Sequence, residues 1–312
     1  MWQNLPLFPD SASTLAGQVD GIYLFSVAIA LIFSALIAVM VITLAIKYRR
    51  RHPDQIGSEE HPPEILELVW SVVPLGIMLV MFFWGARVFV TARTVPANAV
   101  EYHAVAKRWM WKFQHPSGAR EINELHVPVG QTIVMKMTSE DVIHDFFVPA
   151  FRTKYDIVPG RYTTVWFQAT KVGEYHLFCA EYCGAEHSRM GGRVVVMSPR
   201  DYEEWLTHGN AGVAPAASGA ELFGTLACNT CHKSDSAARA PKLDGAYGTQ
   251  VTMVDGTTAK FDDDYIRESI LNPQAKVVSG FQPIMPTFKG QISEDQLLQL
   301  ITYVKSLSGP GK

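Results

Sequence analysis

The sequence predicts a two-helix transmembrane hairpin, then an all-β sandwich, then a C-terminal domain that ends in an amphipathic helix. Three observations lead to this prediction. Two long apolar stretches lie in the first third of the chain, short β-prone segments fill its middle, and apolar residues recur at helical spacing near its end. A chain of 312 residues is long enough for two or three domains.

Two stretches without a charged residue predict the membrane helices. They cover residues 21–46 and 68–86, and a helix needs about 20 apolar residues to cross the hydrocarbon core. Hydrophobic residues make up 48% of the chain and charged residues only 18%, which favours a membrane protein over a wholly soluble one. We expect spans at about 22–46 and 67–92, within an N-terminal unit of residues 1–97.

The distribution of positive charge predicts the orientation of the hairpin. The loop between the spans carries four basic residues, whereas residues 1–20 contain no lysine or arginine. The positive-inside rule therefore places the loop in the cytoplasm and both termini outside. The first span is too long for an ordinary signal peptide and lacks its basic start, although a signal cleaved upstream of residue 1 is an alternative. A net charge of −3 gives no indication of a nucleic-acid partner.

Glu67 lies at the cytoplasmic start of the second span and has two interpretations. A carboxylate is stabilised at a helix N-terminus by the helix dipole. An ionisable group at membrane depth is also typical of a proton path. The residues alone favour the first interpretation.

The middle of the chain, residues 98–200, predicts a small antiparallel sandwich. Segments 125–138, 162–168 and 192–197 are rich in Val, Ile, Thr and aromatic residues, and glycines separate them. About 100 residues suffice for one hydrophobic core.

A cluster of soft donors interrupts this domain. Residues 179–190 read CAEYCGAEHSRM, and His144 lies upstream. The thiolates of Cys179 and Cys183, the imidazoles and the thioether of Met190 suit copper, whereas zinc has little use for methionine. Two thiolates four residues apart could bridge two metal ions and share one electron between them, which is a design for electron transfer.

Simpler interpretations exist for each of these residues alone. Cys179 and Cys183 could form a disulfide outside the cytoplasm, Met190 could fill a core, and the histidines could be surface residues. A membrane-anchored copper chaperone would also use the two cysteines. The joint spacing of all five donors is far more specific to a metal site.

The loop resembles the binuclear copper (Cu-A) site of cytochrome c oxidase subunit II, whose cupredoxin-like sandwich follows two membrane helices. The resemblance implies these copper ligands: the bridging thiolates of Cys179 and Cys183, the imidazoles of His144 and His187, the thioether of Met190, and the main-chain carbonyl of Glu181. It also implies that the Glu181 side chain binds magnesium or manganese at the interface with subunit I.

Two further motifs resemble the same family. Residues 108–113, RWMWKF, resemble an aromatic patch whose first tryptophan receives electrons from cytochrome c, which implies that role for Trp109. Strand packing is the simpler role for this side chain. Residues 67–70, ELVW, resemble the start of the family's second span, where the glutamate opens a proton path into subunit I. With this resemblance, Glu67 becomes the expected proton entry.

A second cysteine pair predicts a covalent haem. Residues 228–232 read CNTCH, which is the attachment signature of c-type haem. Cys228 and Cys231 would bind the porphyrin, and His232 would bind the iron. A redox dithiol or half of a zinc site are the alternatives, but no second cysteine pair remains in this domain to complete a zinc site. Residues 201–218, with the small-residue run VAPAASG, predict a linker before a domain of residues 219–312.

Met253 and Met285 are the candidates for the second iron ligand. Met285 lies in a proline-stiffened loop, FQPIMPTF, before a predicted helix at about residues 293–307, and this stretch resembles the all-α class I cytochromes c, whose axial methionine lies in such a loop. Met253 lies in a segment that predicts a hairpin. We therefore expect Met285 to be the ligand. The apolar residues of the helix are Leu297, Leu300, Ile301 and Val304.

These features together predict an electron-entry subunit of a proton-translocating haem–copper terminal oxidase. Electrons from a cytochrome c or a bc1-type complex would pass through its own haem c and Cu-A to subunit I, which reduces oxygen to water. The alternative is the Cu-A-bearing subunit of a nitric oxide reductase. Expected partners are subunits I and III and membrane lipid. The expected location is the bacterial inner (cell) membrane, crossed more than once, with both termini and the soluble domains outside.

Overall fold

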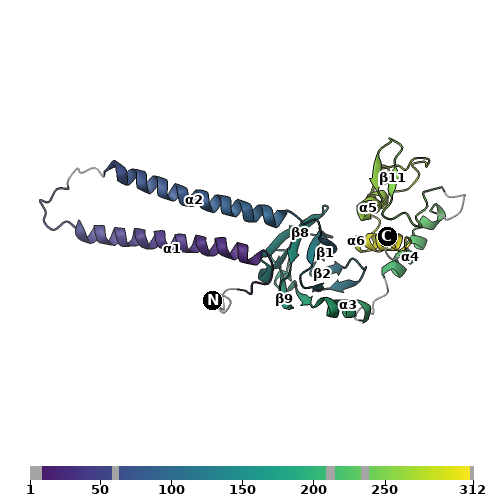
Figure 1. Cartoon of the computed structure of the whole chain (residues 1–312), viewed down its shortest axis with the longest axis horizontal. Coiled ribbons are helices and arrows are strands. Elements are labelled where there is room, and N and C mark those ends of the chain that lie inside the picture. Colours follow the sequence, from purple (N-terminus) through teal and green to yellow (C-terminus); the bar gives the residue numbers. More distant parts are fainter. Residues whose placement is uncertain (1–8, 58–62, 209–214, 233–238, 310–312) are drawn as a thin grey trace.

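The computed structural model describes residues 9–57, 63–208, 215–232 and 239–309. Figure 1 shows a long helical hairpin, a β-sandwich and a C-terminal domain that follow one another along the molecule.

The hairpin consists of α1 (Ala16–Lys47) and α2 (Glu64–Arg93). Both helices are long and apolar enough to cross a membrane, and no residue of their most apolar windows is buried within the chain. They contact one another near the sandwich, where Trp84 packs against Phe25 with ring centroids 5.6 Å apart. Gly21 leaves room for this indole, because a Cβ there would lie 3.2 Å from it. The two predicted spans are therefore helices.

The middle domain is a sandwich of two five-stranded sheets, in the orders β3-β2-β1-β5-β8 and β4-β10-β9-β6-β7. The strands of the first sheet are β1 (Val100–Lys107), β2 (Met110–Gln114), β3 (Arg120–Ile122), β5 (Thr132–Ser139) and β8 (Thr163–Gln168). Those of the second are β4 (Glu124–Pro128), β6 (His144–Val148), β7 (Thr153–Ile157), β9 (Gly173–Cys179) and β10 (Gly191–Met197).

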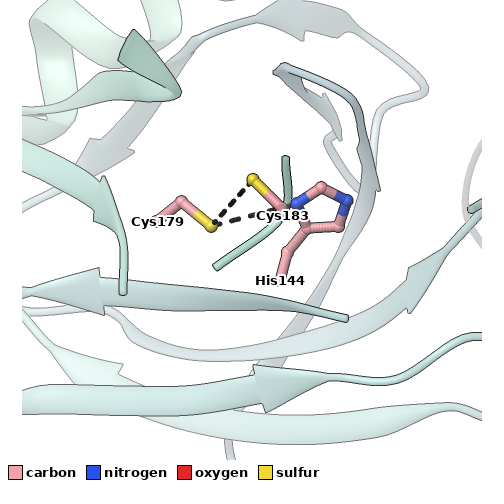
Figure 2. Close-up of side chains that lie close together, drawn as sticks. All are labelled: His144, Cys179 and Cys183. Carbon is pink, nitrogen blue, oxygen red and sulfur yellow. Dashed lines mark hydrogen bonds between the residues drawn. The ribbon is translucent and has the colours of Figure 1, made fainter. Parts of the chain in front are cut away.

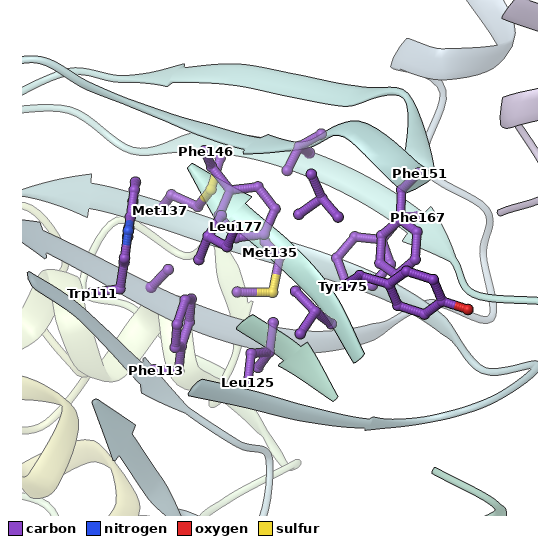
Figure 3. Close-up of a cluster of buried hydrophobic side chains, with 14 of the residues drawn as sticks. Trp111, Phe113, Leu125, Met135, Met137, Phe146, Phe151, Phe167, Tyr175 and Leu177 are labelled. Atoms are coloured by element: carbon purple, nitrogen blue, oxygen red, sulfur yellow. The ribbon is translucent and has the colours of Figure 1, made fainter. Parts of the chain in front are cut away.

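Alternating residues of these strands form one core between the sheets (Figure 3). Its largest fully buried members include Trp111, Phe113, Phe146, Phe167 and Leu177. Burying each such side chain contributes about 1.5–3 kcal/mol. The core therefore fixes the start of β6 and the end of β9, which carry the candidate copper ligands His144 and Cys179.

The prediction of an antiparallel sandwich is wrong for two strand pairs. β1 pairs with β5, and β4 with β10, in parallel registers. The alternation of apolar residues determines which face of a strand is buried but not the direction of its neighbour. Consecutive strands such as β4 and β5 lie in different sheets, so the chain does not fold as a series of hairpins.

The C-terminal part begins with α3 (Pro199–His208), which lies against the sandwich, and α4 (Pro215–Thr225). Residues 201–208 and 215–218 of the predicted linker are thus helical, and residues 209–214 lie outside the described residues. The remaining elements are η3 (Cys228–Thr230), β11 (Gln250–Thr252), β12 (Thr258–Lys260), α5 (Asp263–Leu271) and α6 (Glu294–Ser306).

The predicted final helix is confirmed as α6. Ser293 and Gln296 form a capping box at its start, and its apolar face enters the domain core. Helix α4 crosses α6 at Gly219, where a Cβ would lie 2.1 Å from the Gln299 carbonyl oxygen. Only glycine allows this close approach.

Polar contacts join the C-terminal domain to the outer face of the first sheet. Lys112 on β2 pairs with Asp295 at 2.6 Å, and Gln114 donates to Thr302 at 3.0 Å. Tyr162 donates to Glu294 at 2.8 Å. The interface is therefore mainly hydrogen-bonded and ionic, unlike the core of either domain.

Candidate copper and haem sites

The copper-loop donors come from the ends of three strands. His144 is the first residue of β6, and Cys179 is the last residue of β9. The loop from β9 to β10 contains Cys183 and η2 (His187–Arg189). In the pairing of β6 with β9, Phe146 lies opposite Cys179. This register brings His144 beside the loop although it lies far from it in the sequence. Figure 2 shows the His144 ring and both sulfurs directed toward one common point.

The two cysteines are close but not bonded. Their Sγ atoms lie 3.8 Å apart, whereas a disulfide requires about 2.05 Å, and both are free thiols. His144 Nδ1 lies 3.8 Å from Cys179 Sγ. One ligand atom from each of His144, Cys179 and Cys183 falls within 4.8 Å of the others, and all three residues are buried.

The three remaining predicted ligands adjoin the same sulfurs. His187 Nδ1 lies 3.5 Å and Met190 Sδ 3.7 Å from Cys183 Sγ. The Glu181 carbonyl oxygen lies 3.2 Å from Cys179 Sγ, while its side chain is exposed. Ligands about 2.0–2.3 Å from a tetrahedral metal lie roughly 3.3–3.8 Å from one another. The spacings therefore fit donors arranged around metal ions, and soft sulfurs with imidazole nitrogens suit copper.

Asp141 orients the His144 ring, and sequence reasoning missed this residue. Its carboxylate lies 2.8 Å from His144 Nε2, so it accepts a hydrogen bond from Nε2 and leaves Nδ1 as the nitrogen that faces the sulfurs. Burial works to raise the pKa of Asp141, but hydrogen bonds from the Arg108 backbone and from His144 outweigh it and lower the pKa to about 2. Asp141 is thus ionised at neutral pH.

The metal-free thiols differ in acidity. Burial works to raise the pKa of Cys179, but hydrogen bonds from His144 and from the loop backbone prevail and lower it to about 7. Burial and the adjacent Cys179 thiolate raise the pKa of Cys183. One thiolate therefore forms readily, and a metal cation would favour loss of the second proton.

Trp109 lies beside the copper loop. A Cβ at Gly184 would lie 3.5 Å from its indole. Trp109 is half-buried, and its Nε1 has no hydrogen-bond partner among the described residues. Trp111, fully buried, instead meets the His144 ring edge-on with centroids 6.3 Å apart. Trp109 therefore borders the copper loop just before β2, whereas Trp111 lies within β2 in the sandwich core.

A second polar cluster, also not predicted, lies between the sandwich and α3. Ligand atoms of Glu121, Glu124 and His126 fall within 4.8 Å of one another. Glu121 already accepts from His126 and from His115, the latter at 2.6 Å. Trp205 of α3 stacks on His126 with centroids 4.5 Å apart. These groups satisfy one another, which indicates a structural clamp that holds α3.

The C-terminal domain encloses a cavity of about 560 Å³ lined by Cys228, Cys231, His232, Met285 and mostly apolar side chains. Its size lies within the range of cofactor pockets. His232 Nδ1 lies 2.9 Å from the Pro241 carbonyl oxygen, so it donates its proton there and leaves Nε2 free as a ligand. Burial lowers the pKa of His232, which favours the neutral form that binds iron.

The two methionine candidates occupy different places. Among the described residues, Met285 lines the cavity and Met253 does not. Met253 is buried in the domain core beside the β11–β12 hairpin. The geometry therefore favours Met285 as the group that faces a bound haem.

Glu67 lies in the first turn of α2 and is exposed. That end of α2 is the one remote from the sandwich (Figure 1). Glu67 and the copper loop thus lie near opposite ends of the hairpin–sandwich unit.

The fold and the two sites together define a class: a membrane-anchored redox protein in which a sandwich with clustered sulfur and imidazole donors precedes a c-type cytochrome domain. Models of known protein families match most of the chain. Residues 1–87 match the transmembrane domain of cytochrome c oxidase subunit II, residues 118–198 match its periplasmic domain, and residues 216–308 match cytochrome c.

Individual relatives agree with these matches. Cytochrome c oxidase subunit 2 of Alkalihalophilus pseudofirmus is 26% identical over 92% of this chain and 86% of the relative. Alternative cytochrome c oxidase subunit 2 of Bradyrhizobium diazoefficiens is 32% identical over 50% of this chain and 69% of the relative. The chain belongs to the cytochrome c oxidase subunit II family, and it carries a C-terminal cytochrome c domain.

Among solved structures, the periplasmic domain of subunit II of cytochrome oxidase from Bradyrhizobium japonicum is 30% identical, with a TM-score of 0.35, over 36% of this chain and 95% of that one.

Proposed function

We propose that this chain is the electron-entry subunit of a haem–copper terminal oxidase. The observation that carries the proposal is that one chain holds six converging copper-type donors and a separate cavity lined by a Cys-x-x-Cys-His motif. When bound, a Cu-A centre and a haem c would each accept and release single electrons without binding a substrate.

The chain's own residues would hold these groups as follows. The copper ligands are the six predicted from the sequence: His144, Cys179, Glu181 through its carbonyl, Cys183, His187 and Met190. The haem would be attached to Cys228 and Cys231 and bound axially by His232 and Met285. The contact of Trp109 with the loop supports its proposed role as the point of electron entry to the copper site.

The partners follow from the same proposal. A cytochrome c or a bc1-type complex would donate electrons to the cytochrome domain, and subunit I would accept them from the sandwich and reduce oxygen to water. Subunit III would complete the complex. Glu67 would open a proton path into subunit I, and the exposed carboxylate of Glu181 would bind magnesium or manganese there.

The orientation in the bacterial inner membrane is part of the proposal. Lys47 and the following arginines lie at the end of the hairpin remote from both soluble domains (Figure 1). The positive-inside rule then places the sandwich and the cytochrome domain outside, where c-type haem is attached.

Metal analysis and spectroscopy of the purified chain test the proposal. We expect a copper-to-haem ratio of about two to one, an electron paramagnetic resonance signal shared by both coppers, and a low-spin c-type haem spectrum. A single localised copper, or thiols at 179 and 183 that resist alkylation after metal removal, would refute it. Oxygen consumption by the purified complex with reduced cytochrome c separates an oxidase from a nitric oxide reductase.

A further inference from the structure

Arg152 uses every donor of its guanidinium group. Nε donates to Asp20 Oδ1 at 2.6 Å and Nη2 to Asp20 Oδ2 at 3.0 Å. Nη1 donates to the carbonyl oxygens of Asp10 at 3.0 Å and Pro149 at 2.6 Å, and Nη2 to that of Pro9 at 2.9 Å. An arginine side chain has five N–H groups in a planar fork, and all five have acceptors here. The charged pair is largely buried, with 10% of the Arg152 side chain and 17% of that of Asp20 exposed.

These acceptors belong to two parts of the protein. Asp20 lies in the first turns of the membrane helix α1, and Pro9 and Asp10 precede that helix. Arg152 and Pro149 belong to the sandwich, where η1 (Pro149–Phe151) ends at Arg152 in a left-handed conformation, φ 53°. A non-glycine residue rarely adopts this conformation, and here it directs the guanidinium toward α1.

The segment before α1 is itself built into the sandwich. Ala12 donates its N–H to Ala150 at 2.9 Å and accepts from Thr170 at 2.8 Å. The Ser13 hydroxyl donates to the Phe151 carbonyl at 2.8 Å. Ala12 is fully buried in the core between the sheets. Helix α1 therefore leaves the sandwich from a fixed point.

The second membrane helix has its own tie. Arg93, at the end of α2, donates to the Tyr155 hydroxyl on β7 and lies 4.4 Å from the centre of its ring. Two attachments, one to each helix, prevent the domain from turning about the short connection between α2 and β1.

We propose that Arg152 is a positioning residue that sets the angle of the sandwich on the membrane hairpin, and so the place of the copper loop against subunit I. This inference rests on the proposed function. Strand β6 connects the two points, because it begins at His144 and runs directly into η1 and Arg152.

The strand makes the position of the copper loop sensitive to tilt. Its five residues span roughly 13 Å at about 3.3 Å per step, so a tilt of about 5° at the Arg152 end displaces the His144 end by roughly 1 Å. Electron transfer weakens steeply as the donor and acceptor move apart, so a displacement of that size slows the transfer severalfold. Lysine cannot replace the fork, because a single ammonium cannot make the bidentate contact with Asp20.

The test compares Arg152→Gln and Arg152→Lys with a control, Arg193→Gln. Arg193 is also a sandwich arginine paired with glutamates, and both partners, Glu124 and Glu174, belong to the sandwich rather than to the hairpin. In the assembled oxidase, we expect Arg152→Gln to slow electron transfer from the copper site to subunit I severalfold. The KM for the electron donor, the copper resonance signal and transfer from haem c to copper should not change. Arg152→Lys should be intermediate, and Arg193→Gln should behave as the unaltered protein.

A distance measurement provides a readout that is independent of catalysis. Spin labels on cysteines at Val39 of α1 and Val172 of the sandwich, both exposed, report the angle in the full detergent-solubilised chain. Arg152→Gln should broaden the distance distribution, whereas Arg193→Gln should not. An unchanged distribution, an unchanged transfer rate, or loss of the copper signal together with the rate would each overturn the inference. If the proposed function itself is wrong, the unaltered protein will already lack the copper signal or deliver no electrons to subunit I.

Discussion

The indole of Trp109 lies directly against Gly184 of the copper loop. Gly184 has φ +119°, and a Cβ there would lie 3.5 Å from the ring. The absence of a side chain at 184 thus allows the loop conformation, while a Cβ would only reach ordinary contact distance from the tryptophan. The proposed entry residue for electrons therefore lies next to the loop that carries the candidate copper donors.

Gly184→Ala should distort the copper loop, because an L-residue is strained at this φ by about 1–3 kcal/mol. We expect weaker copper binding and an altered copper resonance spectrum. Gly130→Ala is a matched control, since Gly130 also has positive φ, at +80°, but a Cβ there would meet no other atom within 4 Å. The control should lower stability without changing the spectrum, and equal spectra for both variants would contradict a special role of Gly184.

Met190→Leu should leave copper bound but change its reduction potential and spectrum. The thioether sulfur lies 3.7 Å from Cys183 Sγ, and its removal leaves the thiolates and imidazoles in place. Met137→Leu, a substitution of a fully buried methionine in the sandwich core, should cost less than about 1.5 kcal/mol and leave the spectrum unchanged. Redox titration followed by optical absorption distinguishes the two variants, and an unshifted potential in Met190→Leu would remove this residue from the ligand set.

Met285→Ala should convert the low-spin haem into a form that binds external ligands such as carbon monoxide. Met285 lines the haem cavity, whereas Met253 fills the domain core. Met253→Ala should therefore destabilise the domain by about 2–5 kcal/mol and keep the low-spin spectrum. Absorption spectra with and without carbon monoxide, together with thermal unfolding, check both outcomes. Ligand binding by Met253→Ala alone would reverse the assignment.

Docking of the cytochrome domain on the sandwich should weaken with salt. The interface contains the Lys112–Asp295 pair at 2.6 Å and the Tyr162–Glu294 hydrogen bond at 2.8 Å, and added salt weakens the attraction between charges that remain partly exposed to solvent. Lys112→Glu should raise the radius of gyration seen by small-angle X-ray scattering at low salt. Arg200→Glu, which changes a pair internal to α3, should not raise it. A salt-independent radius in the unaltered chain would contradict this prediction.

Glu67→Gln should slow oxidase turnover without changing either metal spectrum. Glu64→Gln is the control, because Glu64 lies in the same first turn of α2 and contributes equally to the helix N-terminus. If both variants slow turnover alike, or neither does, Glu67 has only the helix-terminal role. Oxygen consumption by the assembled complex is the measurement.

The candidate copper donors could be picked out from the sequence because five of the six lie within residues 179–190, where their spacing resembles that of a known family. The same holds for the Cys-x-x-Cys-His motif. Both spans and the final helix were predictable because their apolar periodicity is local.

Asp141, Arg152 and the cluster around Glu121 were not predicted, because their roles depend on contacts between distant segments. Arg152 meets Asp20 across 132 positions of the chain, and nothing in the residues around it marks a left-handed conformation. The two parallel strand pairs were missed for a related reason, since alternation carries no information on strand direction.

The insertion of residues 9–15 into the sandwich has a consequence for how this protein is made. Residues 9–15 pack into a domain whose strands all follow the two membrane helices in the chain. A fragment that begins after α2 would leave the Ala12 position of the core empty and the backbone partners of Ala12 unpaired. Folding of the sandwich should therefore depend on the segment that precedes α1, and a chain with a wrongly inserted hairpin would lose these contacts.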